Sequence, residues 1–193
     1  MEFLDWHNLM DAGLLRSGKL LIAQPFMQDG NFARSVVFLC EYSEEGSLGF
    51  VLNQPTSVNI GDLLPELHYP SLVVNHGGPV QLDTLHMLHR LPDAIGGIEV
   101  NNGVFWGGSF DALQLQGTVG TLDSSNVRLF VGYAGWSPGQ LENELKEGSW
   151  LIGDISQEVV FDTPPEEVWK AAILSLGKEY KPLANMPVDP GLN

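Results

Sequence analysis

The sequence predicts a single-domain α+β fold in which helices flank a mixed, partly closed, barrel-like β-sheet. Short apolar segments bounded by glycine or proline turns recur along the chain, which is typical of strands. Single helical segments separate some of these strands, whereas hairpin turns join others. The 193 residues are 44% hydrophobic, so one core can bury about 70% of the surface that the unfolded chain exposes.

We divide the chain into three parts. Residues 1–18 are expected to form an N-terminal packing arm, because apolar residues lie there near helical spacing while Gly13 and Gly18 limit the length of any helix. Residues 19–180 are expected to form the α+β domain. Residues 181–193 contain three prolines and are expected to be an irregular tail.

Apolar runs rich in valine, isoleucine and phenylalanine predict the strands of the domain. Two hairpins are expected, one turning at residues 44–46 and one at Asn101-Asn102-Gly103, and residues 24–34 are expected to be a loop. The predicted strands are 19–23, 35–42, 49–53, 72–75, 84–91, 97–100, 104–106, 127–133, 150–155 and 158–161.

Capping residues and helix breakers predict the helices. Ser137-Pro138-Gly139-Gln140 is interpreted as a capping box with proline at the first helical position, and Thr163-Pro164-Pro165-Glu166 repeats it. Ser109 is the expected cap of a third helix. The predicted helices are a short one within 59–67, one over 110–116, one from Pro138 to Gly148 and one from Pro164 to Gly177.

The charge balance argues against direct nucleic-acid binding. The chain carries 9 Lys and Arg against 24 Asp and Glu, a formal net charge of −15, which repels phosphate backbones. Its basic residues are scattered and form no stripe. We therefore expect an unknown small ligand or a protein as the partner; the oligomeric state does not follow from the sequence.

Cysteine usage and the N-terminus predict the compartment. Cys40 is the only cysteine, so no internal disulfide can form, which agrees with a reducing cytoplasm. Residues 1–10 lack a positive n-region, and the apolar run at residues 20–23 is too short for a signal sequence or a membrane span. We expect a cytoplasmic protein that does not enter a membrane.

The segment Gly135-Trp136-Ser137-Pro138-Gly139 matches the G-x-S-x-G pattern between a strand and a helix, which is the context of a hydrolase nucleophile. In that mechanism the residue after the serine donates its backbone N–H to the oxyanion, and Pro138 has none. All five histidines also precede Ser137, whereas these hydrolases place the catalytic histidine after the serine. We therefore interpret Ser137 as a helix cap and assign no catalytic residue.

No metal or cofactor site is expected. His86 and His89 stand three residues apart, which would suit a metal if they shared a helix face. Their segment is predicted to be a strand, where they point to opposite faces. No dinucleotide or phosphate-loop motif is present either.

The glycine-framed turns carry the polar side chains expected at a functional surface. Adjacent glycines let backbone amides converge on an anion, so the turns at 76–78 and 107–109 could together hold a phosphate or a carboxylate. The alternative is that these glycines only permit tight turns with positive φ. The residues expected to line a ligand groove are Asp29, Arg34, Asn53, Pro55, His76, Gly77, Gly78, Pro79, Gly107, Gly108 and Trp136.

Five segments of the chain form a pattern by their order and spacing. They are Leu21-Ile22-Ala23-Gln24-Pro25, Asp29 with Phe32-Ala33-Arg34-Ser35-Val36-Val37, Gly49 to Pro55, Gly77-Gly78-Pro79-Val80, and Gly132 to Glu142. Together they resemble the AlgH/YqgE family of bacterial proteins, from about Lys19 to Leu176. The chain departs from that pattern at Gln24, where the family has Met, and at Ser137, where Gly is usual.

The resemblance implies an α+β fold with a mixed, barrel-like sheet, a cytosolic bacterial protein and no established chemistry. One branch of the family carries a transcriptional-regulator label, so any regulation by this acidic chain is expected to act indirectly, through a protein or a small ligand. The leading hypothesis is a non-enzymatic module that binds a small ligand or a protein. The alternatives are a hydrolase-type enzyme that uses the same groove and a regulator that contacts DNA directly.

Overall fold

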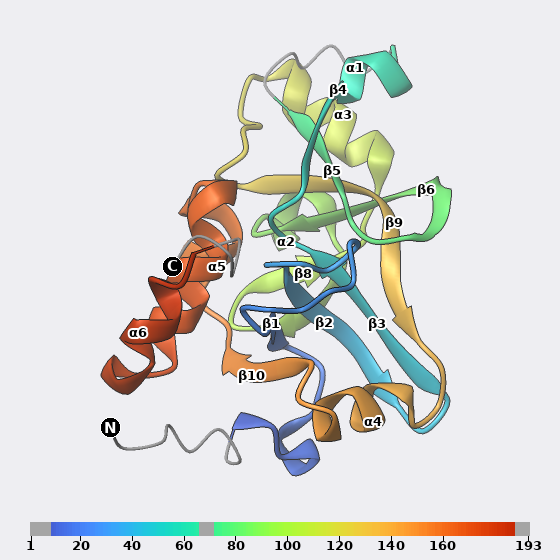
Figure 1. Cartoon of the computed structure of the whole chain (residues 1–193). Helices are drawn as coiled ribbons and strands as arrows, with labels where there is room; N and C mark the ends of the chain where they lie inside the picture. Colours follow the sequence, from blue (N-terminus) through green and yellow to red (C-terminus); the bar gives the residue numbers. More distant parts are fainter. Residues whose placement is uncertain (1–8, 66–71, 188–193) are drawn as a thin grey trace.

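The computed structural model describes residues 9–65 and 72–187 (Figure 1). The strands are β1 (Lys19–Ala23), β2 (Val36–Ser43), β3 (Gly46–Val51), β4 (Pro55–Asn59), β5 (Val73–His76), β6 (Val80–His89), β7 (Ile98–Asn101), β8 (Val104–Trp106), β9 (Val127–Trp136) and β10 (Trp150–Asp154). The α-helices are α1 (Ile60–Leu63), α2 (Pro92–Ile95), α3 (Phe110–Thr118), α4 (Gln140–Lys146), α5 (Pro165–Ser175) and α6 (Lys181–Ala184), and the other helical turns are η2 (Ala12–Leu14), η3 (Glu158–Asp162) and η4 (Lys178–Tyr180).

The strands form one mixed sheet that curls into a half-barrel. Eight of them follow the order β10-β1-β2-β3-β9-β6-β8-β7, and β4 pairs with β5, which pairs in turn with β9. β9 joins the two halves of this sheet. The first part of β9 pairs with β6 in antiparallel and with β5 in parallel, whereas its last residues pair with β3. Figure 1 shows β9 curving from the upper half of the molecule down toward α4. The predicted α+β fold with a partly closed sheet is thus confirmed.

The core explains why β1 and β2 read as continuous apolar runs. Leu20 and Ile22 belong to the same buried cluster as α5, whereas Leu21 and Ala23 pack in a second cluster with α4. Alternate strand residues point to opposite faces of a sheet, so both faces are covered here by helices. Figure 1 shows α5 and α6 to the left of this part of the sheet and α4 below it.

Both predicted hairpins form, between β2 and β3 and between β7 and β8. Cys40 lies buried in β2, where burial raises the pKa of its thiol well above the ordinary value, as does the neighbouring Glu41 carboxylate. These features suit a cysteine that packs in the core. Within the described residues, no helix is long and apolar enough to cross a bilayer.

Residues 158–161 are not the strand that was predicted. They form the π-helical turn η3, in which Val159, Val160 and Phe161 are all buried. A short, continuous apolar run has no alternation that separates a buried strand from a buried helical turn, which is why the prediction failed. The backbone N–H of Val159 donates to the Ser156 hydroxyl at the start of the turn.

Neither predicted capping box forms in full. α4 begins at Gln140, after Gly139 in the left-handed conformation. The Ser137 backbone N–H donates to Oε1 of Gln140, which is one half of a capping box, but the Gln140 backbone N–H donates to the carbonyl of Ser137 instead of to its hydroxyl. At α5 the proline pair does begin the helix, but the backbone N–H of Thr163 donates to the carbonyl of Glu158 and is not available to Glu166.

The two ends of the chain contact the core where they are described. Residues 1–8 of the predicted packing arm and residues 188–193 of the predicted tail lie outside the described residues. The rest of the arm contains one 3-10 turn, η2, and a buried Leu15. The tail is not irregular throughout, because Lys181–Ala184 form α6 and its Leu183 is fully buried.

Candidate functional site

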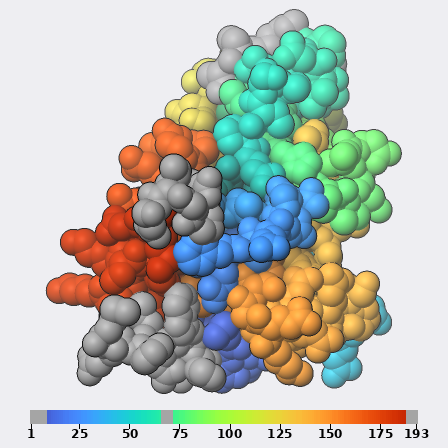
Figure 2. All heavy atoms as spheres, in the orientation of Figure 1, coloured from blue at the N-terminus to red at the C-terminus, as the bar shows by residue number. Residues whose placement is uncertain are grey.

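A cavity of about 650 Å³ opens between the 24–32 loop, the end of β9, α4 and the start of β10. In Figure 2 the loop (blue) and the α4 region (orange) lie beside each other on the same face of the molecule. We call this cavity the aromatic pocket. Its walls are formed by Gln24, Phe26, Met27, Gln28, Asp29, Asn31, Phe32, Pro79, Gly135, Trp136, Gln140, Glu144, Gly148, Ser149 and Trp150.

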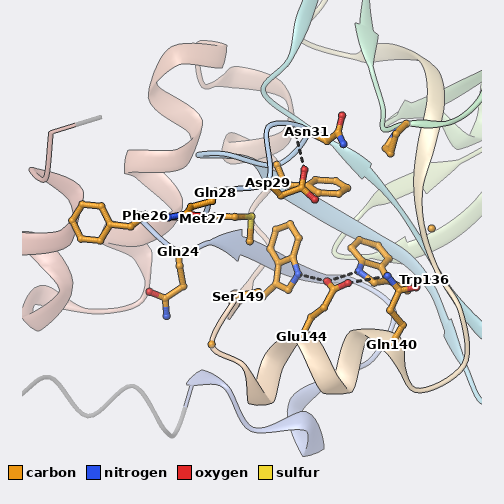
Figure 3. Close-up of a pocket in the computed structure, with 15 residues that line it drawn as sticks. Gln24, Phe26, Met27, Gln28, Asp29, Asn31, Trp136, Gln140, Glu144 and Ser149 are labelled. Carbon is orange, nitrogen blue, oxygen red and sulfur yellow. Dashed lines mark hydrogen bonds between the residues drawn. The ribbon is translucent and has the colours of Figure 1, made fainter. Parts of the chain in front are cut away.

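The carboxylate of Glu144 organises one wall of the aromatic pocket (Figure 3). Its Oε2 accepts hydrogen bonds from the indole N–H groups of Trp136, at 2.9 Å, and Trp150, at 2.8 Å. Its Oε1 accepts from the side-chain amide of Gln140, at 2.9 Å and one helical turn away. All three donors are neutral, so they hold the carboxylate in place without supplying a counter-charge.

The side chains around this carboxylate are aromatic. The ring of Phe32 stacks on Trp136 with centroids 6.2 Å apart and meets Trp150 edge-on at 5.4 Å. The two indoles meet edge-on at 6.0 Å. Because Trp136 and Trp150 are almost fully buried, these contacts fix the rings as a rigid wall.

A second carboxylate lies at the aromatic pocket. Asp29 is exposed in the 24–32 loop, and its Oδ1 accepts the backbone N–H of Asn31. No lysine, arginine or histidine is among the described residues that line the cavity, and within residues 9–65 and 72–187 neither carboxylate forms an ion pair. The pocket thus combines aromatic surface with negative charge.

Three of the eleven residues predicted for the groove, Asp29, Pro79 and Trp136, line this pocket. Asn53 is used inside the fold instead: its Oδ1 accepts the N–H of Val36, and its Nδ2 donates to the carbonyl of Arg34. His76 lies close to the Gln54 side chain, with Nδ1 3.2 Å from Oε1. Neither Asn53 nor His76 lines the aromatic pocket with Trp136, so the proposed shared groove of these three residues is not formed there.

Arg34 faces the C-terminal segment rather than the aromatic pocket. Its guanidinium lies 4.2 Å from the ring centre of Trp169, and its Nη2 donates to the carbonyls of Met186 and Pro187. Desolvation lowers its pKa below the ordinary value. The residue holds the last described part of the chain against α5.

Two of the backbone amides expected to form an anion cradle are used inside the fold. The backbone N–H of Gly77 donates to the carbonyl of Val131, and that of Gly107 donates to Met87. Gly78 has a φ of +150°, and a Cβ there would meet the Tyr133 backbone at 2.2 Å. The alternative of a turn with positive φ accounts for Gly78, whereas at Gly77 a Cβ would lie 2.3 Å from the carbonyl oxygen of Gly132.

The remaining groove candidates lie elsewhere. Gly108 has a φ of +116° and packs on the side chain and backbone of Ile95, so Gly107 and Gly108 shape the turn before α3. Pro55 lines a different cavity. His86 and His89 both lie on β6, as predicted, and no group of three or more His, Cys, Asp or Glu side chains within the described residues could hold a metal.

Sequence reasoning missed Glu144, Gln140, Phe32 and Trp150 as parts of one site. The Gln140 and Glu144 spacing of four was visible, and it places both on one helix face. Nothing in the sequence indicated that Trp136 and Trp150, which are 14 residues apart, would both donate to one carboxylate oxygen. That meeting depends on how α4 packs against the ends of β9 and β10.

Comparisons with known proteins agree with the fold. The family model described as AlgH-like (DUF179) matches residues 20–181. A UPF0301 protein of Chlorobium limicola is 42% identical over 180 residues, and one of Chlorobaculum tepidum is 44% identical over 181. Both alignments cover 93% of this chain, with 96% and 97% of the respective relative.

Two solved structures share the architecture. The solution structure of the AlgH protein from Pseudomonas aeruginosa is 33% identical, with a TM-score of 0.69 over 88% of this chain and 93% of that one. A crystal structure of protein DIP2367 from Corynebacterium diphtheriae, at 23% identity, has a TM-score of 0.75 over 95% of this chain and 100% of that one, which is a likeness of fold. This chain therefore belongs to the AlgH-like family.

Proposed function

We propose that the protein is a non-enzymatic binding module whose aromatic pocket takes a small organic cation, such as a protonated amine on an apolar body. The observation that carries this proposal is the Glu144 carboxylate, held by two indole N–H groups at the wall of an open cavity without a lysine or arginine in its lining. A carboxylate has about four acceptor positions, and three here are taken. One remains for a ligand N–H.

The surroundings support a cation over an anion. Asp29 and Glu144 would repel a phosphate or a carboxylate, and the net charge of −15 adds to that repulsion at long range. Aromatic rings attract cations through their π faces by about 0.5–2 kcal/mol, and the half-buried Phe32 is a ring of this cavity that a ligand can reach. Phe26, which is 50% exposed at the same cavity, offers additional apolar surface for the body of the ligand.

The two other hypotheses have less support. A hydrolase needs a nucleophile beside a base, yet Ser137 is exposed and precedes Pro138, which cannot donate an N–H to an oxyanion. A regulator that contacts DNA directly would have to overcome the acidic net charge. An indirect regulatory role remains compatible with a ligand-binding module.

The test uses 2-phenylethylammonium as the probe and phenylacetate, of similar shape and opposite charge, as its control. We expect the ammonium to cause saturable NMR shifts at the indole N–H signals of Trp136 and Trp150. We expect phenylacetate to cause none, because the carboxylates of the pocket repel it. Binding of both probes alike, or of neither, would refute the proposal.

The matched variants are Glu144→Gln and Glu147→Gln. The first removes the charge at the pocket while keeping an oxygen that can accept the indole N–H groups, and it should weaken binding of the ammonium at least about tenfold. Glu147 is exposed just beyond α4 and outside the pocket lining, so its variant should bind as the wild type does. Equal affinity in Glu144→Gln and wild type would count against the pocket.

A further inference from the structure

A second cavity, of about 440 Å³, lies between the β4–β5 pair, the start of β9 and the segment that leads into α5. We call it the arginine pocket, because Arg128 lines it. Its walls are otherwise mostly apolar, with Leu72, Val73, Val127 and Phe161 among them. The arginine pocket and the aromatic pocket share no lining residue.

Arg128 is only 8% exposed, yet its partners are all neutral. Its Nη1 donates to the carbonyl of Val160 at 2.9 Å. Its Nη2 donates to the carbonyl of Leu52 and to Oδ1 of Asn75, both at 2.7 Å. A guanidinium has five N–H groups, so two remain after these three bonds.

The Nε–H group is one of the two that remain, and it is not sealed inside the protein. Within the described residues, the buried side-chain nitrogen that lacks any hydrogen bond is Nε of Arg34, so Nε of Arg128, which is not used in the three bonds above, is not buried. Arg128 lines the arginine pocket, so a ligand in that cavity can reach this donor.

The positive charge of Arg128 has no carboxylate to balance it within residues 9–65 and 72–187, where the ion pairs are Lys19 with Asp154 and Arg90 with Asp162. Asp162 does line the arginine pocket, but both of its oxygens bind the Arg90 guanidinium, at 2.9 and 3.3 Å. A buried cation without a counter-charge is costly, and an anion that enters the cavity would offset that cost.

We propose that the arginine pocket binds the carboxylate of a small organic acid. The carboxylate meets the free Nε–H group of Arg128, and the apolar body of the acid lies against Val73, Val127 and Phe161. Desolvation lowers the pKa of Arg128 to about 10, so the group still carries its charge at neutral pH.

A singly charged carboxylate fits better than a phosphate. The pocket supplies one uncompensated cation, whereas the first turn of the adjoining helix α5 carries Glu166 and Glu167. These carboxylates and the net charge of −15 penalise each added negative charge on a ligand. The apolar walls also favour an acid with a hydrocarbon body over a bare inorganic ion.

The test is an NMR titration of the isotope-labelled full chain with sodium benzoate, at an ionic strength kept constant with sodium chloride. We expect saturable shifts of the Arg128 side-chain N–H and of the backbone amides of Val127 and Thr163, which line the same pocket. Inorganic phosphate should shift these signals much less. Benzoate shifts no larger than those of chloride, or phosphate shifts as large as those of benzoate, would overturn the proposal.

Val73 and Leu82 are both exposed, and substitutions there give matched variants that leave Arg128 in place. Val73→Glu puts a carboxylate at the wall of the pocket and should weaken benzoate binding at least about tenfold, by repulsion or by occupying the guanidinium. Leu82→Glu adds the same charge at an exposed strand position outside the pocket and should bind benzoate as the wild type does. Unchanged benzoate affinity in folded Val73→Glu would overturn the site.

Discussion

Glu144 and Arg128 each keep a charge beside a cavity while bonding only to neutral groups. Two indoles and an amide hold the Glu144 carboxylate, whereas two backbone carbonyls and the Asn75 amide oxygen hold the Arg128 guanidinium. Neutral dipoles orient a charge without cancelling it, so the field of each group extends into its cavity. The two cavities therefore differ in sign within one acidic chain.

A residue-scale prediction concerns two glycines with positive φ and different surroundings. A Cβ at Gly78 would lie 2.2 Å from the backbone of Tyr133 and Ala134, whereas one at Gly139, which is in the left-handed helical region, would meet nothing within 4 Å. We expect Gly78→Ala to lower the free energy of unfolding by about 3 kcal/mol or more, through overpacking and backbone strain. Gly139→Ala should cost only about 1 kcal/mol, from backbone strain alone.

Urea unfolding of both variants measures this difference. The two substitutions are chemically identical, so the conformational entropy of the unfolded chain changes by a similar amount in each. Equal losses in the two variants would mean that the close approach at Gly78 does not constrain the turn.

At the scale of elements, β9 connects the two candidate sites. Arg128 stands near its start and Trp136 at its end. Its pairing changes from β5 and β6 to β3 along its length, and Gly132, with a φ of +65°, lies between the two parts. A residue with a side chain would be strained at that bend. The curl of the sheet and the separation of the two cavities thus both depend on this strand.

The element-scale prediction concerns the tether between β2 and α4. The Tyr42 hydroxyl donates to Oε1 of Glu142 at 2.7 Å, and this bond, then burial, then repulsion by the carboxylate raise the pKa of Tyr42 to about 12. The ordinary pKa in the unfolded chain is about 10, so the stabilisation is complete below about pH 10 and is lost as the pH rises toward 12. The difference in unfolding free energy between wild type and Tyr42→Phe should therefore shrink between about pH 9 and pH 11.5.

Chemical unfolding at both pH values checks this expectation. Glu142→Gln provides the comparison, because it removes the charge that repels the phenolate and should flatten the same pH dependence. A difference between wild type and Tyr42→Phe that stays constant over this range would show that the tether does not hold the phenol in its neutral form.

At the scale of the whole molecule, net charge sets the long-range behaviour. The formal charge of −15 on 193 residues makes the compact state repel itself, while the local charges at the two cavities select among ligands at short range. The negative field of the whole molecule attracts the cation proposed for the aromatic pocket and repels the carboxylate proposed for the arginine pocket. The arginine pocket therefore depends more strongly on its single cation.

The molecular-scale prediction is that salt stabilises the fold. Raising sodium chloride from about 10 mM to about 150 mM shortens the screening length from about 30 Å to about 8 Å and weakens the repulsion among carboxylates. We expect the melting temperature to rise by a few degrees, about equally with potassium chloride, because screening depends on ionic strength. Scanning calorimetry measures it, and a melting temperature that stays level or falls would show that self-repulsion is not a significant cost.

The strands and hairpins were predictable because their signals are local. The run from Lys19 to Ala23 and the turn at residues 101–103 carry their own conformational preference, and both occur as expected. The errors arose where local signals compete. Ser137 has the residue type of a helix cap, but the Gln140 backbone N–H donates to the Ser137 carbonyl instead of to its hydroxyl, and the helix begins later.

The sequence by itself determined the α+β class, the acidic field and the family pattern, because composition, periodicity and turn chemistry are properties of neighbouring residues. The tertiary structure alone decided which polar groups meet. It placed Asp29, Pro79 and Trp136 at one cavity with Glu144 and used Asn53 and Arg34 for internal bonds. It also placed Arg128, without a carboxylate partner among the described residues, at the wall of a second cavity. A site made of distant segments depends on the angles at which helices and strands pack, and no local preference encodes those angles.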